Sequence, residues 1–243
     1  MTTRQRADRL LVERGLFESR ARAQAAIAAG LVTADGLAVR KPSEEISPSA
    51  VIEARPEHPY VSRGGIKLAA ALDHFGLDVT DCVCLDVGAS TGGFTEVLLL
   101  RGAKRVFAVD VGRDQLHPSL RGRKDIVSLE ETDIRAVDRS RFPEQPNFAT
   151  VDVSFISLKL VLPTVGILLT PRATLVALIK PQFEAQRRDI KKGIVRDPIV
   201  HAAICDDIAA FLTALGWRVG SLVASPILGG DGNREFFVEA ARG

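Results

Sequence analysis

Four ionisable side chains, far apart in the sequence, lie at the positions that a parallel sheet would bring together. Lys67 falls in the first helix expected after residue 65, and Asp152 ends the fourth strand-like segment after that residue. Lys180 ends the fifth such segment, and Glu235 opens the last. Because the carboxyl ends of parallel strands share one edge of a sheet, these groups could meet there. Two lysines and two carboxylates neutralise one another, which makes a partly buried cluster tolerable.

This cluster could remove a proton from a hydroxyl group. A hydroxyl that attacks an electrophile must lose its proton, and a partly buried lysine beside a second cation could accept it. Lys180 would then act as the base, and the carboxylates would orient the two lysines and the hydroxyl. From spacing alone, a structural ion-pair network without a catalytic role is an equal alternative.

A glycine-rich segment predicts a binding site for a cofactor. The sequence "CLDVGASTGGFTEVLL" has the pattern of a strand, a loop and a helix. It is no dinucleotide fingerprint, because Ser90 stands where the second glycine should be, and no lysine follows to make a P-loop. Gly88 would permit a tight turn, while Gly92 and Gly93 would let a ligand approach the backbone at a helix N-terminus. The alternative is that the glycines only form a turn.

Two carboxylates further along the chain extend this site. Asp110 ends the next strand, where a carboxylate can bind ribose hydroxyls, and Asp133 lies near the end of the third, placed to meet an adenine amino group. A glycine loop and two carboxylates in this order resemble an S-adenosylmethionine methyltransferase. The predicted cofactor-binding residues are Asp86, Gly88, Ser90, Thr91, Gly92, Gly93, Phe94, Asp110 and Asp133.

Two other kinds of methyl transfer, and a metal site, are disfavoured. Amino-methylating enzymes resemble one another in an Asn/Asp-Pro-Pro-aromatic motif after the fourth strand, whereas residues 152–155 read "DVSF". Cytosine-5 methylation needs a cysteine nucleophile at the carboxyl end of a strand, but Cys82 and Cys84 begin their strand and Cys205 lies within a helix. Three cysteines without a CxxC pair predict no metal site and no disulfide scaffold, and they fit a reducing cytoplasm.

The elements that position these residues alternate between strands and helices from residue 66 onward. The pattern predicts an α/β, Rossmann-like class I methyltransferase sheet that is mostly parallel and has helices on both faces. Segments 217–226 and 234–242 predict one antiparallel strand near the C-terminus. The strands expected before them are 82–88, 105–112, 125–132, 147–155 and 172–180, with helices at 93–102, 156–169 and 197–216.

Residues 1–55 are expected to form a small α+β domain of their own. Segments 6–17 and 19–30 predict two short helices, with Ser19 as the N-cap of the second. Segment 31–40 predicts a hairpin that turns at Asp35-Gly36. A unit of this size cannot bury a large core, and we therefore expect it to bind a partner or to pack against the rest of the chain. Residues 56–65 predict a linker, and residues 66–243 the second domain.

Together these motifs resemble one family from end to end. The order Lys, Asp, Lys, Glu is similar to that of the FtsJ-type RNA ribose 2′-O-methyltransferases. The N-terminal unit and the segments "SRGGIKLAAAL", "VDVSFISL", "LIKPQFE" and "GNREFFV" resemble the TlyA family of ribosomal RNA cytidine 2′-O-methyltransferases, often labelled hemolysins. The linker "RPEHPYVSRGG" differs from the short linker associated with that family.

The resemblance implies roles for particular residues. The catalytic tetrad would be Lys67, Asp152, Lys180 and Glu235, with Lys180 as the base. Residues 1–55 would be an RNA-binding domain of the ribosomal-protein S-four type. A basic stretch after Lys180 and the N-terminal arginines suit phosphate contacts, although solvated surface charges are the alternative. The predicted RNA-binding residues are Arg4, Arg6, Arg20, Arg22, Arg187, Arg188, Lys191 and Lys192.

The sequence therefore predicts a cytoplasmic enzyme that transfers a methyl group from S-adenosylmethionine to a ribose 2′-hydroxyl, of cytidine by resemblance, in ribosomal RNA. Ribosomal subunits, small or large, would be its partners. A net charge of +2 neither requires nor excludes a nucleic acid. Three alternatives are weighed: a small-molecule O-methyltransferase, a non-catalytic RNA-binding protein, and a membrane-active hemolysin. The basic N-terminal unit disfavours the first, and the complete tetrad disfavours the second. The lack of an apolar run of about 18 residues disfavours the third.

Overall fold

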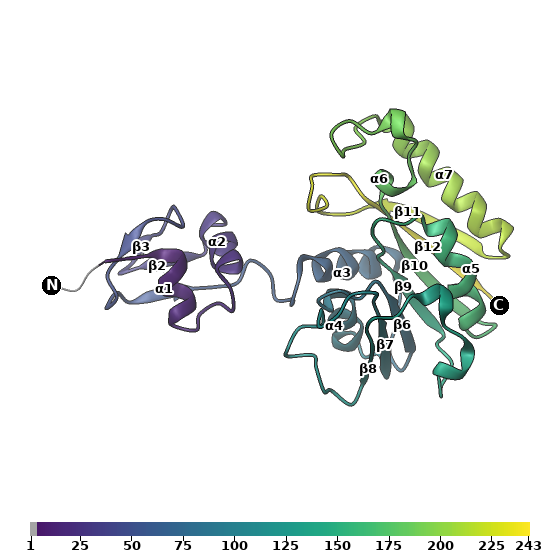
Figure 1. Ribbon diagram of the computed structural model, residues 1–243, viewed down its shortest axis with the longest axis horizontal. Helices are drawn as coiled ribbons and strands as arrows, with labels where there is room; N and C mark the ends of the chain where they lie inside the picture. Colours follow the sequence, from purple (N-terminus) through teal and green to yellow (C-terminus); the bar gives the residue numbers. More distant parts are fainter. Residues whose placement is uncertain (1–3) are drawn as a thin grey trace. The chain divides into compact units, whose positions relative to one another are not determined.

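The computed structural model describes residues 4–243 and divides into two compact units, Met1–Pro59 and Tyr60–Gly243 (Figure 1). The division falls inside the segment that the sequence predicts to be a linker. Helix α3 begins at Arg63, so the last three residues of that segment are helical. Each unit has its own hydrophobic core. No helix within the described residues is long and apolar enough to cross a membrane.

The N-terminal unit packs two helices against short antiparallel strands. Ser19 caps the second helix, because its Oγ accepts a hydrogen bond from the backbone N–H of Arg22. Asp35 and Gly36 both have positive φ angles, 51° and 76°, which confirms the predicted hairpin turn. The elements are β1 (Gln5–Arg6), α1 (Ala7–Glu13), α2 (Arg20–Ala28), β2 (Val32–Ala34), β3 (Leu37–Ala38), β4 (Glu45–Ile46) and β5 (Ile52–Ala54). Strand β1 pairs with β4, and the other three form a sheet in the order β3-β2-β5.

The C-terminal unit is built on a seven-stranded sheet in the order β11-β12-β10-β9-β6-β7-β8. Strand β12 runs antiparallel to both of its neighbours, and the other pairings within β10-β9-β6-β7-β8 are parallel. This confirms the predicted class I methyltransferase architecture. The strands are β6 (Val83–Val87), β7 (Arg105–Val109), β8 (Ile126–Leu129), β9 (Phe148–Val151), β10 (Ala173–Ile179), β11 (Arg218–Ala224) and β12 (Phe236–Arg242).

Helices cover both faces of this sheet (Figure 1). The core on one face joins Cys84 of β6 to α3 (Arg63–Phe75) and α4 (Gly93–Leu100), and the core on the other joins Leu85 to α5 (Leu158–Leu168) and α7 (Pro198–Ala214). Successive strand residues point to opposite faces, so a strand covered on both sides must be apolar throughout. The remaining helical turns are η1 (Ile134–Ala136), η2 (Arg139–Arg141), α6 (Pro181–Glu184) and η3 (Arg187–Asp189).

The strand directions bring the chemistry-bearing residues to one edge. Strands β6, β7, β9 and β10 end at the carboxyl edge of the sheet, and the antiparallel β12 begins there. Asp152 directly follows β9, Lys180 directly follows β10, and Glu235 directly precedes β12. The antiparallel direction of the last strand is therefore what places Glu235 beside residues that end parallel strands.

Candidate active site

Two lysine–carboxylate ion pairs lie at this carboxyl edge. Lys67 Nζ, on the second turn of α3, lies 2.6 Å from Glu235 Oε2. Lys180 Nζ lies 2.7 Å from Asp152 Oδ1 and donates a hydrogen bond of 2.8 Å to Ser154 Oγ. Lys67 and Asp152 line the same cavity. The structure thus brings together the four residues that the sequence predicts as a tetrad, and adds Ser154 to them.

Both pairs are largely withdrawn from water. The side chains of Lys67 and Glu235 are 11% and 3% exposed, and those of Lys180 and Asp152 are 11% and 20% exposed. Desolvated charges are costly unless each meets an opposite charge at close range, as these do. A Cβ atom at Gly229 would contact Glu235 Oε1, so the loop before β12 packs tightly onto this carboxylate. The arrangement holds two lysine nitrogens in defined positions at the carboxyl edge of the sheet, next to the cavity that Lys67 and Asp152 line.

Two adjoining cavities lie above these pairs. The first, of about 440 Å³, is lined by Asp110, Asp133 and Phe155 among others. The second, of about 340 Å³, is lined by Lys67, Thr91, Gly93 and Phe94 among others. Residues that line both are Gly88, Ser90 and Asp152. Seven of the nine predicted cofactor residues thus line one or both cavities, whereas Asp86 and Gly92 line neither.

The glycine loop leaves no room for side chains. Gly88 has a φ of 82°, and a Cβ there would lie 2.5 Å from the backbone oxygen of Asp152. Gly92, with a φ of 92°, is the N-cap of α4 and packs on Leu116 and Leu120. A Cβ at Gly93 would lie 2.9 Å from the backbone nitrogen of Gly65. Backbone N–H groups at a helix N-terminus can therefore come close to an anionic group of a ligand.

The carboxylate of Asp110 is held in a position from which it can accept hydrogen bonds from hydroxyl groups. Its Oδ2 accepts a hydrogen bond of 2.8 Å from the backbone N–H of Ser90, and its Oδ1 accepts one of 2.7 Å from Gly112. Each oxygen keeps further lone pairs, and the side chain lines the larger cavity. A vicinal diol could therefore bind both oxygens at once. Such a carboxylate at the end of the second strand fits the ribose of a nucleoside cofactor.

Asp133 also lines the larger cavity, but much of its hydrogen-bonding capacity is used. Its carboxylate receives hydrogen bonds from the side chain and the backbone N–H of Arg135, and these hold the pKa of Asp133 below its usual range. The neighbouring Glu130 is a residue that the sequence did not indicate. Its carboxylate accepts backbone hydrogen bonds from Asp114, Gln115 and Leu116, and so fixes the loop that supports Gly92.

Asp86 lines neither cavity, although the sequence predicts it as a cofactor ligand. It is fully buried, and its oxygens accept hydrogen bonds from Thr95 Oγ1 at 2.6 Å and Thr150 Oγ1 at 2.9 Å. Burial raises the pKa of Asp86 to about 6, against the effect of these hydrogen bonds. Asp86 therefore joins β6, α4 and β9 behind the glycine loop.

Replacing Asp86 by Asn should change how stability depends on pH. The carboxyl pKa is about 6 in the folded chain and 3.8 as a free group, so the stability due to its proton is full below about pH 3.8 and is lost as pH rises through about 6. Between about pH 4 and pH 7.5, we expect the wild type to lose up to about 3 kcal/mol relative to Asp86→Asn. Urea unfolding followed by fluorescence of Trp217, the single tryptophan, measures this. A difference that is constant with pH would contradict it.

Residues 60–65, predicted as linker, form a wall of the smaller cavity. Ser62, Arg63 and Gly64 line it. The backbone N–H of Val61 donates a hydrogen bond of 2.6 Å to Glu96 Oε2 on α4, and the Tyr60 ring packs against Gly65. The paired glycines in "SRGG" were the only sequence signal that this segment packs closely on the backbone of the glycine loop.

Phe155 is an exposed aromatic residue at the mouth of the larger cavity. Its side chain is 92% exposed, and its φ of 64° lies in the left-handed region that phenylalanine rarely adopts. Its ring lies 5.1 Å, between centroids, from that of Phe183. Backbone strain at a ligand-facing residue suggests that its orientation serves a function. An aromatic face held beside the tetrad could stack on a planar base.

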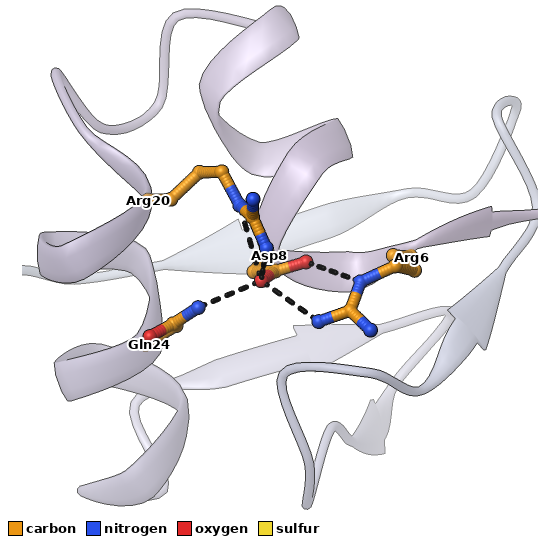
Figure 2. A network of polar contacts seen from close by, with 4 residues as sticks. All are labelled: Arg6, Asp8, Arg20 and Gln24. Atoms are coloured by element: carbon orange, nitrogen blue, oxygen red, sulfur yellow. Dashed lines mark hydrogen bonds and ion pairs between the residues drawn. The ribbon is translucent and has the colours of Figure 1, made fainter.

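Two of the predicted RNA-binding arginines, Arg6 and Arg20, are held by the buried carboxylate of Asp8 (Figure 2). Arg6 donates two hydrogen bonds of 3.1 Å, and Arg20 donates one of 2.7 Å and one of 3.3 Å. Gln24 adds a further donor at 2.8 Å. Hydrogen bonds, foremost from Arg6, hold the pKa of Asp8 well below its usual range. These two arginines thus join β1, α1 and α2, and their outer surfaces are still exposed.

Replacing Asp8 by Asn should loosen the N-terminal unit. The charged acceptor of four arginine hydrogen bonds is lost, which we expect to cost about 2 kcal/mol of local stability. Hydrogen–deuterium exchange of the full-length chain, read over residues 7–28, should become faster. The control is Glu18→Gln, which removes a more exposed ion pair with Arg22 of 3.6 Å. Equal exchange in the two variants would contradict a structural role for Asp8.

The other predicted RNA-binding residues lie on the surface. Arg4 is exposed, and Arg22 is paired with Glu18. Those of the C-terminal unit lie in the segment between α6 and α7, and all are exposed: Arg187, Arg188, Lys191 and Lys192. Within residues 4–243 no group of three or more His, Cys, Asp or Glu side chains is arranged to hold a metal ion.

Comparisons with known proteins match both units and the whole chain. Residues 60–242 match the FtsJ-like methyltransferase family, and residues 5–52 match the S4 domain. YqxC of Bacillus subtilis is 47% identical over 97% of this chain and 85% of its own length. The 16S/23S rRNA (cytidine-2′-O)-methyltransferase TlyA of Mycobacterium tuberculosis is 42% identical over 98% of this chain and 90% of its own. A solved structure of a Streptococcus thermophilus protein with a hemolysin name has a TM-score of 0.78 and 43% identity, and covers 100% of this chain and 90% of that one.

Proposed function

The chain belongs to the TlyA family of FtsJ-like methyltransferases, and on that premise we propose how its own residues carry out methyl transfer. It is an S-adenosylmethionine-dependent enzyme that methylates ribose 2′-hydroxyl groups of ribosomal RNA. The observation that supports our assignment of residues is the presence of two lysine–carboxylate ion pairs, largely withdrawn from water, at the carboxyl edge of the sheet beside the cavities.

The cavities fit S-adenosylmethionine. Gly88, Ser90 and Gly93 of the glycine loop line the cavities, and Asp110 presents a carboxylate that two backbone N–H groups hold in place for a ribose diol. Asp133 and Ile134 line the part of the cavity beyond Asp110, where we place the adenine. When bound, the cofactor supplies an electrophilic methyl group.

Lys180 is the base in this proposal. Its Nζ is held by Asp152 on one side and by Ser154 on the other, so its position is fixed before the substrate arrives. As a neutral amine it takes the proton from the 2′-hydroxyl and becomes an ammonium paired with Asp152, and the hydroxyl oxygen becomes the nucleophile. The ammonium of Lys67, held in place by its ion pair with Glu235, stabilises negative charge that develops on that oxygen.

We propose that the ring of Phe155 stacks on the base of the target nucleotide. Replacing it by Ala removes an exposed aromatic face and should raise the KM for RNA about 10- to 100-fold, because stacking on one base contributes about 1–3 kcal/mol. Affinity for the cofactor, measured by calorimetry, should change little. Phe155→Tyr is the matched control and should keep most of the activity. An unchanged KM in Phe155→Ala would refute this assignment.

We place the S4 domain on ribosomal RNA and the reaction on ribosomal subunits in the cytoplasm, with cytidine as the target nucleoside. The similarity to rRNA (cytidine-2′-O)-methyltransferases supports this substrate. The test is incubation of the enzyme with labelled S-adenosylmethionine and, separately, small subunits, large subunits, whole ribosomes and naked rRNA. Label should appear in at least one of them. If none is labelled although RNA is bound, the chain would be a binding protein without activity, and lysis of lipid vesicles without methylation would support the hemolysin alternative.

A further inference from the structure

A separate cavity of about 500 Å³ lies between the start of α7 and the start of β12. Its lining has two arginines and no carboxylate: Arg196, Pro198, His201, Ala202, Cys205, Arg234 and Phe236. Glu235 contacts Lys67 of α3, whereas the flanking Arg234 and Phe236 belong to the opposite face of the sheet, with α7. The cavity is therefore next to the tetrad but behind it.

The guanidinium groups of Arg196 and Arg234 make no hydrogen bond or ion pair within residues 4–243, and both side chains are exposed. Other arginines of the same unit form ion pairs, for example with Asp125, Asp133 and Asp73. Two cations that line one cavity, with no carboxylate in its lining, favour an anionic ligand there. Planar guanidinium groups suit phosphate, which they can bind with two parallel hydrogen bonds.

Buried groups fix the two segments that carry these arginines. Asn233, 1% exposed, donates from Nδ2 to the backbone oxygen of Gly193 at 2.9 Å and accepts on Oδ1 from the backbone N–H of Val195 at 3.1 Å. The buried His201 ring hydrogen-bonds the Val195 oxygen through Nε2 at 3.0 Å. Arg196 and Arg234 each directly follow a residue of this network. The backbone that carries both arginines is thus fixed in advance, which lowers the entropic cost of binding.

We propose that Arg196 and Arg234 form a subsite for a backbone phosphate of the substrate RNA, close to the methylated nucleotide. The subsite rests on the function proposed above, because the RNA must pass the carboxyl edge of the sheet to reach Lys180. Arg234 adjoins Glu235, and Phe236 pairs with Ile179, the residue before Lys180. A strand held here is fixed in position relative to the base. Arg196 also lines an adjacent cavity with Arg188 and Lys191, whose lining includes the carboxylates Asp189 and Asp197 as well.

The test compares Arg196→Gln, Arg234→Gln and the double variant with the wild type, using the ribosomal particle that the wild type methylates. Each single change should weaken binding about 5- to 10-fold at moderate salt and lower the slope of log K against log salt by about one. The double variant should lose about 50-fold, while affinity for S-adenosylmethionine stays constant. The matched control is Arg218→Gln at the start of β11, at the opposite edge of the sheet, which should bind like the wild type.

Particle affinity and salt slope equal to those of Arg218→Gln would overturn the subsite. A fall in kcat with an unchanged salt slope would also overturn it, because the arginines would then act through Glu235. Binding can be read without methylation. If the wild type bound particles but labelled none, the proposed function would fail, and the affinities of the variants would still decide on the subsite.

Discussion

Lys180→Met is expected to lower kcat for RNA methylation by about 10²- to 10⁴-fold, the range of general-base contributions. The side-chain nitrogen of Lys180, directly after β10, lies between Asp152 and Ser154. Methionine keeps the length of the chain but has no nitrogen to take the proton. The affinity for S-adenosylmethionine, measured by calorimetry, should change less than three-fold, about 0.6 kcal/mol.

Lys180→Arg separates the base from the charge. An arginine can keep the ion pair with Asp152, but it stays protonated and cannot accept a proton. We expect it to be nearly as inactive as Lys180→Met. Lys104→Met is the control, since Lys104 is also paired with a carboxylate, Glu144, and precedes β7 at the opposite edge of the sheet. An active Lys180→Arg enzyme would show that Lys180 acts only through its charge.

Asp110→Ala is expected to raise the Kd for S-adenosylmethionine by at least about 100-fold. Hydrogen bonds to charged groups contribute about 1.5–3 kcal/mol each, and the cofactor ribose could donate two to this carboxylate. The loss also frees the N–H groups of Ser90 and Gly112, which Asp110 now accepts from. Asp110→Asn, which retains one oxygen, should have an intermediate Kd.

Calorimetry of the cofactor with purified enzyme measures this effect. The control is Asp125→Ala, which removes a surface carboxylate paired with Arg123 just before β8, away from the cavities. Its Kd should match that of the wild type. If Asp110→Ala bound the cofactor as tightly as Asp125→Ala, Asp110 would not be the ribose ligand, and the proposed orientation of the cofactor would be wrong.

The sequence predicted those features that depend on strand direction. Asp152 and Lys180 end strands whose continuous apolar residues indicate burial on both faces, so both had to lie at one edge. Glu235 required a further inference, that the last strand runs antiparallel, and the pairing of Phe236 with Ile179 bears this out. Lys67 could be placed only within its helix, and its contact with Glu235 comes from the packing of α3 on the sheet.

Other features depend on contacts that no spacing reveals. Asp86 seemed a ligand because it ends a strand next to the glycine loop, but Thr95 and Thr150 bind its carboxylate within the core. Arg6 and Arg20 read as surface cations, although Asp8 is enclosed between them. The sequence alone reveals neither the burial nor the partner of a charged residue. The surroundings of Asp86 and of the two arginines could therefore be seen only in the structure.

The central claim is that the tetrad directs the methyl group to a ribose oxygen rather than to a base. The most direct measurement is digestion of RNA from labelled ribosomal particles to nucleosides, followed by mass spectrometry, for the wild type and for Lys180→Met. We predict a 2′-O-methylated nucleoside, cytidine under our proposal, that the wild type produces and Lys180→Met does not. Methylation on a base, or an equal yield of the 2′-O-methylated nucleoside from both proteins, would contradict the mechanism.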